Sequence, residues 1–417
     1  MRYGVIGEVL GHSFSKEIHS HLADYEYEIC EIPRENLKSF FEKRDFCAIN
    51  VTIPYKKEVI PHLDVVSDIA RELDSVNTIV NKNGTLYGYN TDYYGLKMLI
   101  ERSGADLCGK KVLVLGTGGT SRTAHLVAVH LGAKEVYLVS RQTKEGAIDY
   151  ADAQTYHSDA DVIINATPCG MYPNNYANPL NLDKFPKACA IIDAIFNPLS
   201  SELVLDARAK GIIGAGGLYM LVAQAVFAVE FFLDTKIPKE KIESVFDKIY
   251  KSKENIVLIG MPCSGKSTVG KTLANNLGRE LFDLDIEIEK AIGTTIAEYF
   301  AAHGEGAFRE VESEILKEIS KKTGVIISTG GGAILKNENV RALRANGKLY
   351  FLDRALELLF PTDDRPLSRS RDDLAALFEA RYPLYLAAAD VRVDGDGSPQ
   401  YVADLIRKDF SNEDTCN

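Results

Sequence analysis

Two glycine-rich stretches contain the residues whose types and spacing most clearly indicate chemistry. One of them, GMPCSGKST (260–268), satisfies the pattern G-x-x-x-x-G-K-[ST] between an apolar run and an amphipathic segment. That order predicts a strand, a phosphate-binding loop and a helix, with Lys266 reaching toward the β- and γ-phosphates of ATP and Ser267 ligating Mg²⁺. The predicted nucleotide contacts are Gly260, Ser264, Gly265, Lys266, Ser267 and Thr268.

The other stretch, GTGGTSR (116–122), nearly fits a dinucleotide-binding turn. Gly116 allows the tight turn, Gly118 lets the backbone approach a pyrophosphate, and the small Ser121 stands where a third glycine is usual. The next expected strand ends in Ser140 and Arg141, where an NAD site would carry an acidic residue. Because a cation there suits a 2′-phosphate, the sequence favours NADP(H) over NAD. A glycine turn without a ligand and a solvated surface arginine are the plain alternatives.

The elements that must position these loops alternate short apolar runs with amphipathic stretches, which is typical of an α/β protein. The expected strands are 3–7, 46–54, 110–116, 135–141, 161–168, 190–196 and 255–259. The expected helices are 16–25, 120–133, 217–234 and 268–278, of which 217–234 is strongly apolar. The lysine-rich segment 247–254 is the predicted linker, and a fresh strand–loop–helix begins at 255.

Composition narrows the class of protein. The chain has 417 residues, is 46% apolar and 26% charged, and carries a net charge of -11 with no Lys/Arg-rich block, so we expect no nucleic-acid partner. Its seven cysteines are dispersed without a C-x-x-C pair, which favours reduced thiols. No secretory h-region or run of 18 apolar residues occurs, so a cytoplasmic protein without a membrane partner is expected. The sequence leaves a homodimer open.

Seven short motifs before residue 250 resemble shikimate dehydrogenases in order and spacing. They are GHSFS (11–15), NVTIPYK (50–56), SVNTI (75–79), YNTDYYG (89–95), GTGGTSR, NATPCGM (165–171) and GLYMLVAQ (217–224). The resemblance implies that Lys56 and Asp92 form the catalytic pair. It implies substrate contacts from Ser13, Ser15, Thr52, Asn77 and Gln224, and cofactor contacts that add Gly119, Thr120, Arg122, Thr167, Gly217 and Met220 to those of the turn.

The residue chemistry agrees with that assignment. Hydride transfer to a carbonyl carbon requires a proton on the attached oxygen, which an ammonium such as that of Lys56 can donate while a carboxylate orients it. Which of the pair acts as the base in the oxidation direction stays open. One position departs from the family: the segment DAIFNP carries Phe196 where a tyrosine is common, so altered affinity or rate is expected.

The segment after residue 255 resembles shikimate kinases. The motifs are FDLDIEIE (282–289), GEGAFREVE (304–312), STGGGAIL (328–335), DDRPLS (363–368) and RYPLY (381–385). The resemblance implies that Asp285 activates the attacking hydroxyl, that Asp283 lies near Mg²⁺, and that Arg365 reaches the transferred phosphoryl group from a lid. It further implies that Arg309, Arg381, Gly331 and Gly332 bind the acceptor, with Glu312 holding Arg309.

Together these resemblances predict an α/β chain with a shikimate-binding domain (1–100, completed by a helix at about 217–250), a Rossmann NADP-binding domain (101–216) and a P-loop, NMP-kinase-like domain with a parallel sheet (255–410). The predicted function is NADPH-dependent reduction of 3-dehydroshikimate followed by ATP- and Mg²⁺-dependent phosphorylation of shikimate. The rival hypotheses are an NAD-dependent quinate/shikimate dehydrogenase fused to a different small-molecule kinase, and a ligand sensor with inactive enzyme-like halves.

Overall fold

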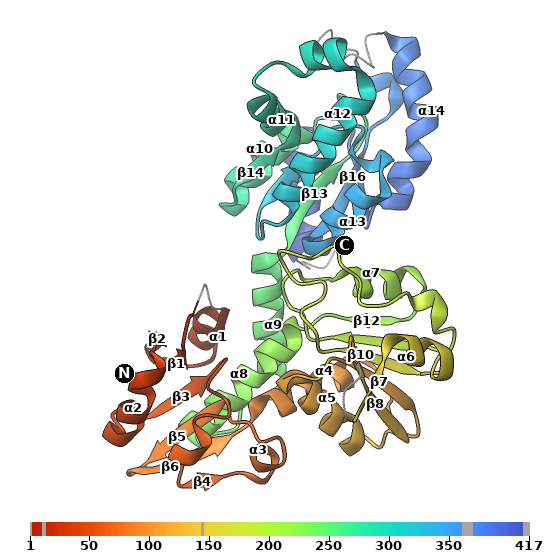
Figure 1. Ribbon diagram of the computed structural model, residues 1–417. Helices are drawn as coiled ribbons and strands as arrows, with labels where there is room; N and C mark the ends of the chain where they lie inside the picture. Colours follow the sequence, from red (N-terminus) through yellow and green to blue (C-terminus); the bar gives the residue numbers. More distant parts are fainter. Residues whose placement is uncertain (1, 11–13, 143–145, 361–369, 412–417) are drawn as a thin grey trace. The chain divides into compact units, whose positions relative to one another are not determined.

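The computed structural model describes residues 2–10, 14–142, 146–360 and 370–411. The chain divides into two compact units, residues 1–250 and 251–417 (Figure 1).

A mixed sheet opens the first unit. Its strands are β1 (Tyr3–Gly7), β2 (Tyr27–Glu31), β3 (Ala48–Val51), β4 (Val65–Val66), β5 (Thr78–Lys82) and β6 (Thr85–Tyr89), in the order β2-β1-β3-β5-β6-β4. β1 runs parallel to β2 and β3, whereas β5 is antiparallel to β3 and β6. Its helices are α1 (Phe14–Leu22), α2 (Leu37–Lys43) and α3 (Asp68–Glu72). Every residue of β3 is buried, as expected of a central strand covered on both faces.

The second sheet of this unit is entirely parallel. Its strands are β7 (Lys111–Leu115), β8 (Glu135–Ser140), β9 (Ala147–Asp149), β10 (Val162–Asn165), β11 (Ala190–Asp193) and β12 (Ile213–Ala215). Their order, β12-β11-β10-β7-β8-β9, confirms the predicted Rossmann arrangement. The direction of winding reverses between β7 and β10, and such reversals leave a crevice at the carboxyl ends of the strands.

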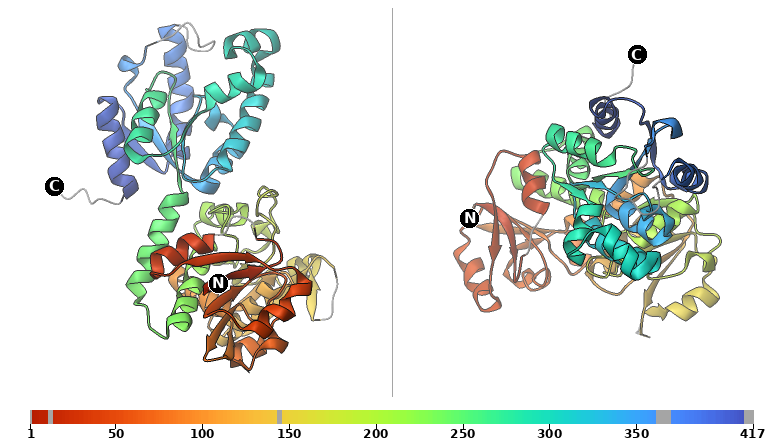
Figure 2. Two further views of the ribbon diagram at one scale, coloured as in Figure 1. Left: turned by 90° about the vertical axis from the view of Figure 1, so that its left-hand side faces the viewer. Right: turned by 90° about the horizontal axis from the view of Figure 1, so that it is seen from above.

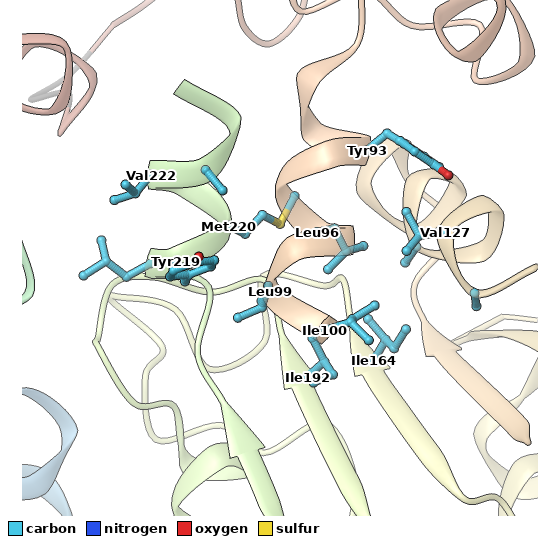
Figure 3. Packing of buried hydrophobic residues seen from close by; sticks show 14 of the residues in the cluster. Tyr93, Leu96, Leu99, Ile100, Val127, Ile164, Ile192, Tyr219, Met220 and Val222 are labelled. Carbon is cyan, nitrogen blue, oxygen red and sulfur yellow. The ribbon is translucent and has the colours of Figure 1, made fainter. Parts of the chain in front are cut away.

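Helices cover both faces of the parallel sheet. They are α4 (Thr91–Ser103) and α5 (Gly119–His130) on one face and α6 (Tyr150–Tyr156) and α7 (Glu202–Ala209) on the other. The remaining helices of the first unit are α8 (Leu218–Leu233) and α9 (Lys239–Lys253). The apolar stretch 217–234 forms α8, which packs with α4 and with side chains of β10 and β11 in one buried cluster (Figure 3). Alternate strand residues such as Leu113 and Ile163 point to a second cluster, which also contains Leu203 of α7.

The segment 247–254, expected as a linker, is helical up to Lys253 as the end of α9. Its lysines suggested a solvated connection, but Ile242, Val245 and Ile249 recur at helical spacing and are buried. The apolar stripe therefore outweighs the polar composition. The division between the two units, after Tyr250, falls inside this helix.

A five-stranded parallel sheet forms the centre of the second unit. Its strands are β13 (Asn255–Ile259), β14 (Leu281–Asp283), β15 (Ile326–Ser328), β16 (Gly347–Asp353) and β17 (Val391–Asp394), in the order β14-β15-β13-β16-β17. The helices are α10 (Lys266–Leu277), α11 (Leu284–Ile292), α12 (Ile296–Ser320), α13 (Asn337–Asn346), α14 (Arg371–Ala388) and α15 (Pro399–Ser411). They lie on both faces of the sheet (Figure 2). Val257 and Ile259 face one cluster while Ile256 and Leu258 face another.

Short 3-10 turns complete the described structure, at Arg34–Asn36, Ile60–His62, Leu182–Lys184, Ala333–Leu335 and Leu356–Leu358. None of the helices that the structure describes has the length and apolar character needed to cross a membrane.

Candidate functional site

Lys56 and Asp92 meet beside the mixed sheet of the first unit. Lys56 lies in the loop after β3, and Asp92 lies in the first turn of α4. The Nζ of Lys56 donates to Oδ2 of Asp92 at 2.6 Å, with both side chains partly exposed, at 29% and 21%. The pair combines an ammonium donor with a carboxylate that fixes its direction, and both groups remain accessible to a ligand.

Polar groups expected to bind substrate gather next to this pair. Oδ1 of the buried Asn77 accepts from the backbone N–H of Thr91 at 2.7 Å, which fixes the orientation of the amide. The hydroxyl of Thr91 lies within hydrogen-bonding distance of Asn77 Oδ1 (3.2 Å) and of Gln224 Oε1 (3.3 Å). None of the described residues accepts a hydrogen bond from Nδ2 of Asn77, so its two donors are available to a hydroxylated ligand.

Thr52, Ser15 and Ser13 are the remaining predicted substrate contacts, and the structure gives less detail about their surroundings. Thr52 follows β3, and its backbone N–H donates to Ile6 of the neighbouring strand at 3.0 Å. Ser15 lies in the first turn of α1, and Ser13 lies outside the described residues. The structure thus brings Lys56, Asp92, Asn77 and Gln224 together through direct contacts or through Thr91.

The glycine turn of the parallel sheet borders a cavity of about 1030 Å³. Gly116 has a φ of +110°, and an added Cβ there would lie 2.6 Å from Oγ of Ser121. Gly118 caps α5, and an added Cβ would meet no protein atom within 4 Å, so space remains for a ligand. The predicted cofactor residues that line the cavity are Gly116, Gly118, Ser140, Arg141 and Thr167. The cavity is large enough for a dinucleotide and carries a cation at the strand end, so it fits NADP(H).

The other predicted cofactor residues do not line this cavity. Gly119, Thr120 and Arg122 are exposed in the first turn of α5, and the backbone N–H of Arg122 donates to the carbonyl oxygen of Gly118 at 3.1 Å. The side chain of Ser121 is buried beneath the turn, and Met220 is buried in the core between α4 and α8 (Figure 3). Gly217 serves close packing, because an added Cβ would lie 2.2 Å from the carbonyl oxygen of Ala194.

A buried polar network that the sequence motifs did not predict lies behind Thr167. Oδ1 of Asn165 accepts from the N–H and the hydroxyl of Thr167 at 3.1 and 2.7 Å, and its Nδ2 donates to Asp193 at 3.0 Å. Ser201 donates to the other oxygen of Asp193 at 2.5 Å. Burial raises the pKa of Asp193 to about 6, although these hydrogen bonds oppose the rise. A signal was present: both residues end consecutive apolar strands, where the sheet edge faces a ligand crevice.

Phe196, the departure from the dehydrogenase pattern, packs against Phe14 at the start of α1. The two rings meet edge to face, with centroids 5.4 Å apart at 83°. A ring at position 196 therefore lies beside the segment that carries Ser15, and it lacks the hydroxyl that a tyrosine would bring there.

The phosphate-type loop of the second unit joins β13 to α10. Gly260 and Gly265 have φ values of +151° and +90°, and an added Cβ on Gly260 would lie 2.9 Å from the carbonyl oxygen of Leu352. Nζ of the buried Lys266 donates to the carbonyl oxygens of Gly260 and Met261 at 2.9 and 2.8 Å. The side chain of Lys266 thus folds back onto the start of the loop, beside the N-terminus of α10, whose N–H groups can bind phosphate.

Two aspartates stand at the neighbouring strand end. Asp283 ends β14 and caps α11, its Oδ1 accepting from the N–H of Asp285 at 3.2 Å. Across from them, an added Cβ on Gly330 would lie 2.9 Å from Oδ1 of Asp285 and 3.0 Å from Oε1 of Glu312. No cluster of three or more acidic, His or Cys ligands occurs among the described residues. A site with few protein ligands suits Mg²⁺, which is usually held by one or two carboxylates together with phosphates.

Arg309 of α12 lies directly against the triple-glycine turn. Its Nη1 donates to Oε2 of Glu312 at 2.7 Å, and its Nη2 pairs with Glu305 at 3.1 Å. Burial lowers the pKa of Arg309, but the two carboxylates outweigh burial and raise it above the ordinary value. An added Cβ on Gly332 would lie 2.1 Å from Nη1. The guanidinium therefore occupies the space that only glycine leaves.

Arg381 reaches the same turn from α14. It is 6% exposed, and its Nη1 donates to the carbonyl oxygen of Gly331 at 3.1 Å. Burial raises the pKa of Glu312, a rise that Arg309 and Arg381 oppose and Asp285 reinforces. Arg309, Arg381 and Asp285 are thus all close enough to Glu312 to shift the pKa of its carboxylate. Arg365, the remaining arginine of the prediction, lies outside the described residues.

Family models match both parts of the chain. The model of the shikimate dehydrogenase substrate binding domain matches residues 5–79, and the shikimate kinase model matches residues 262–410.

Relatives similar to the first part of the chain are also shikimate dehydrogenases. The chain is 34% identical over 265 residues to shikimate dehydrogenase (NADP(+)) of Clostridium perfringens strain SM101, which covers 59% of this chain and 97% of the relative. Among solved structures, a chorismate mutase/shikimate 5-dehydrogenase fusion protein from Clostridium acetobutylicum is 33% identical, with a TM-score of 0.57, covering 59% of this chain and 96% of that one. Shikimate 5-dehydrogenase from Thermus thermophilus in complex with NADP(H) and shikimate is 28% identical, with a TM-score of 0.53, covering 60% and 99%.

The chain covers almost the whole length of these dehydrogenases, and the kinase model matches a separate part of it, residues 262–410. The chain therefore belongs to the shikimate dehydrogenase family in its first unit and carries a shikimate kinase domain in its second, which makes it a bifunctional enzyme of the shikimate pathway.

Proposed function

We propose that the first unit reduces 3-dehydroshikimate to shikimate with NADPH and that the second unit phosphorylates this shikimate with ATP to shikimate 3-phosphate. The proposal rests above all on the two constellations described above. The Lys56–Asp92 contact suits proton transfer to an oxygen, and the Arg309–Arg381 pair suits a carboxylate-bearing acceptor. Both constellations lie in units that also carry a nucleotide loop.

In the first unit, bound NADPH would supply the hydride. Lys56 donates a proton to the oxygen on which negative charge develops, and Asp92 keeps the ammonium directed toward it. Asn77 and Gln224 bind substrate hydroxyls through amide groups whose orientation Thr91 and Leu221 fix. Thr52, Ser13 and Ser15 complete the proposed substrate contacts, and Arg141 favours the 2′-phosphate of NADP over NAD.

In the second unit, bound ATP would supply the phosphoryl group, with Ser267 and Asp283 as the groups of the chain nearest to Mg²⁺. Asp285 accepts a hydrogen bond from the attacking hydroxyl and so increases its nucleophilicity. Arg309 and Arg381 bind the acceptor carboxylate against the glycine turn, and Glu312 holds Arg309 in place. Lys266 leaves the loop carbonyls for the phosphates, a charge-assisted exchange that favours the nucleotide-bound state.

The test is a coupled assay on the full chain that starts from 3-dehydroshikimate, NADPH and ATP. Lys56→Ala should lose NADPH oxidation by about 100-fold or more and keep the phosphorylation of added shikimate, because general acid catalysis contributes on the order of 10²–10⁴. Lys266→Ala should show the reverse pattern. Lys57→Ala, whose ammonium pairs with the exposed Asp74, and the exposed Lys271→Ala are matched controls. Loss of both steps from either single change would contradict two independent sites.

For location we propose the cytoplasm, supported by the six cysteines that the structure describes, all of them free thiols. For assembly we propose a homodimer, which sedimentation of the purified chain tests directly.

A further inference from the structure

The sheet order assigns the two ends of a nucleotide to opposite sides of the phosphate loop. The loop follows β13, the central strand, with β15 and β14 on one side and β16 and β17 on the other. Asp283, Asp285 and Gly331, the proposed acceptor-side groups, follow β14 and β15. Because the transferred phosphate must face the acceptor, the rest of the nucleotide has to extend toward β16 and β17.

Arg354 is the first residue after β16, on that second side. The backbone around it is fixed by two contacts with the loop after β17: the N–H of Gly395 donates to the carbonyl oxygen of Asp353 at 2.8 Å, and the N–H of Ala355 donates to Asp396 at 2.9 Å. Both neighbours of Arg354 are thus anchored, which fixes the direction in which its side chain leaves the sheet edge.

The guanidinium of Arg354 ends beside the phosphate loop. Its Nη1 lies 3.7 Å from the position that a Cβ on Gly265 would take. Gly265 caps α10 and immediately precedes Lys266. The positive group therefore stands next to a helix N-terminus, where free N–H groups already favour an anion.

This guanidinium has no protein partner among the described residues. Its Nε is buried without a hydrogen bond. The nearby carboxylates are engaged elsewhere: Asp353 pairs with Arg392 at 2.5 Å and accepts from Tyr382 at 3.0 Å. Arginine carries five donors and no acceptor, and a buried donor without a partner costs free energy. An arginine kept unpaired at this place is explained if an anionic ligand completes its hydrogen bonds.

We propose that Arg354 binds the α-phosphate of ATP, opposite the acceptor side of the phosphate loop. The inference rests on the proposed ATP-binding role of that loop and adds to it a residue that the loop pattern does not contain. Arg354 holds the nucleoside end of the phosphate chain, so that the γ-phosphate keeps its direction toward Asp285.

The test compares Arg354→Gln and Arg354→Lys with the full-length wild type. For Arg354→Gln we expect the KM for ATP and the Kd for ADP to rise about tenfold, the loss typical of one charge-assisted contact. The KM for shikimate should stay within about twofold, since the acceptor groups lie on the other side of the loop. Arg354→Lys keeps the positive charge but not the two-pronged donor geometry of the guanidinium, so its affinity for ATP should fall less than that of Arg354→Gln. It also provides the test if Arg354→Gln does not fold. Arg407→Gln, on α15, where Arg407 pairs with Asp404, is the matched control and should bind ATP as wild type does.

Two further readouts separate the explanations. An equal loss of kcat/KM with ATP and with GTP supports a phosphate contact, whereas a loss confined to ATP would overturn it in favour of a base contact. An unchanged KM for ATP in Arg354→Gln would also overturn the inference, provided that Lys266→Ala abolishes phosphorylation. If Lys266→Ala itself has no effect, the proposed function of the loop fails instead.

Discussion

Gly332→Ala should selectively impair acceptor binding in the kinase unit. The new methyl carbon would lie 2.1 Å from Nη1, 2.3 Å from Cζ and 2.5 Å from Nη2 of Arg309. Ordinary carbon contacts are about 3.5–4.0 Å, so the guanidinium must retreat by more than roughly 1 Å. The displaced group is the end of a flexible side chain, so the fold can absorb the change while the position of the charge cannot.

The expected size of the effect follows from the contacts that move. A hydrogen bond to a charged group contributes about 1.5–3 kcal/mol, and each 1.4 kcal/mol is a factor of about ten in affinity. The KM for shikimate in the phosphorylation reaction should therefore rise roughly 10- to 100-fold. The KM for ATP and the rate of NADPH oxidation should stay near their wild-type values. The assay follows ADP release while shikimate and ATP are varied in turn.

Gly306→Ala is the matched control for this change. Gly306 lies on α12, as Arg309 does, but an added Cβ would meet no atom within 4 Å, so its phosphorylation kinetics should not change. Arg309→Ala should reproduce the loss, and adding Gly332→Ala to it should cost little more, because both changes remove one interaction. A wild-type KM for shikimate in Gly332→Ala, or losses that add in the double variant, would refute the reasoning.

Two further predictions concern the dehydrogenase unit. Burial raises the pKa of Asp193 from 3.8 to about 6 in the folded protein. The protonated carboxyl therefore contributes fully to the free energy of unfolding below pH 3.8, and this contribution is lost as the pH rises through 6. The loss is roughly 3 kcal/mol, at about 1.36 kcal/mol per pKa unit. Amide exchange of β10 and β11 between pH 4 and 7 should therefore show a fall in protection that shrinks in Asp193→Asn; an identical slope in the variant would contradict this. Phe196→Tyr brings a hydroxyl beside Phe14 and the α1 segment, so kcat or the KM for shikimate of the dehydrogenase should change by less than about tenfold, with the kinase unaffected. Wild-type values of both constants would show that the position has no influence.

The sequence was sufficient where the chemistry is local. The phosphate loop, its strand and its helix are consecutive in the chain. Gly260 and Gly265 take backbone conformations that residues with a side chain rarely adopt. The Rossmann turn and the assignment of Arg141 to the end of β8 follow from the same short-range logic. The predicted linker at 247–254 contains the division between the two units, but it is helical up to Lys253 with Ile249 buried, which its lysine-rich composition did not indicate.

The tertiary structure decided what depends on which strand ends meet. It explains the triple-glycine turn, since Gly330 and Gly332 leave room for Asp285 and Arg309, which belong to other elements. It joins Asn165 to Asp193 behind Thr167, and it packs Met220 between α4 and α8.

Arg354 shows most clearly what the sequence alone does not predict. In the sequence it is one arginine after an apolar run, with no motif around it. Only the order of the sheet places it beside Gly265, nearly ninety positions earlier in the chain, with its donors unpaired among the described residues. Local backbone geometry is determined by residues that are neighbours in the sequence, whereas the position of a charge that completes a binding site depends on which strands pair in the sheet.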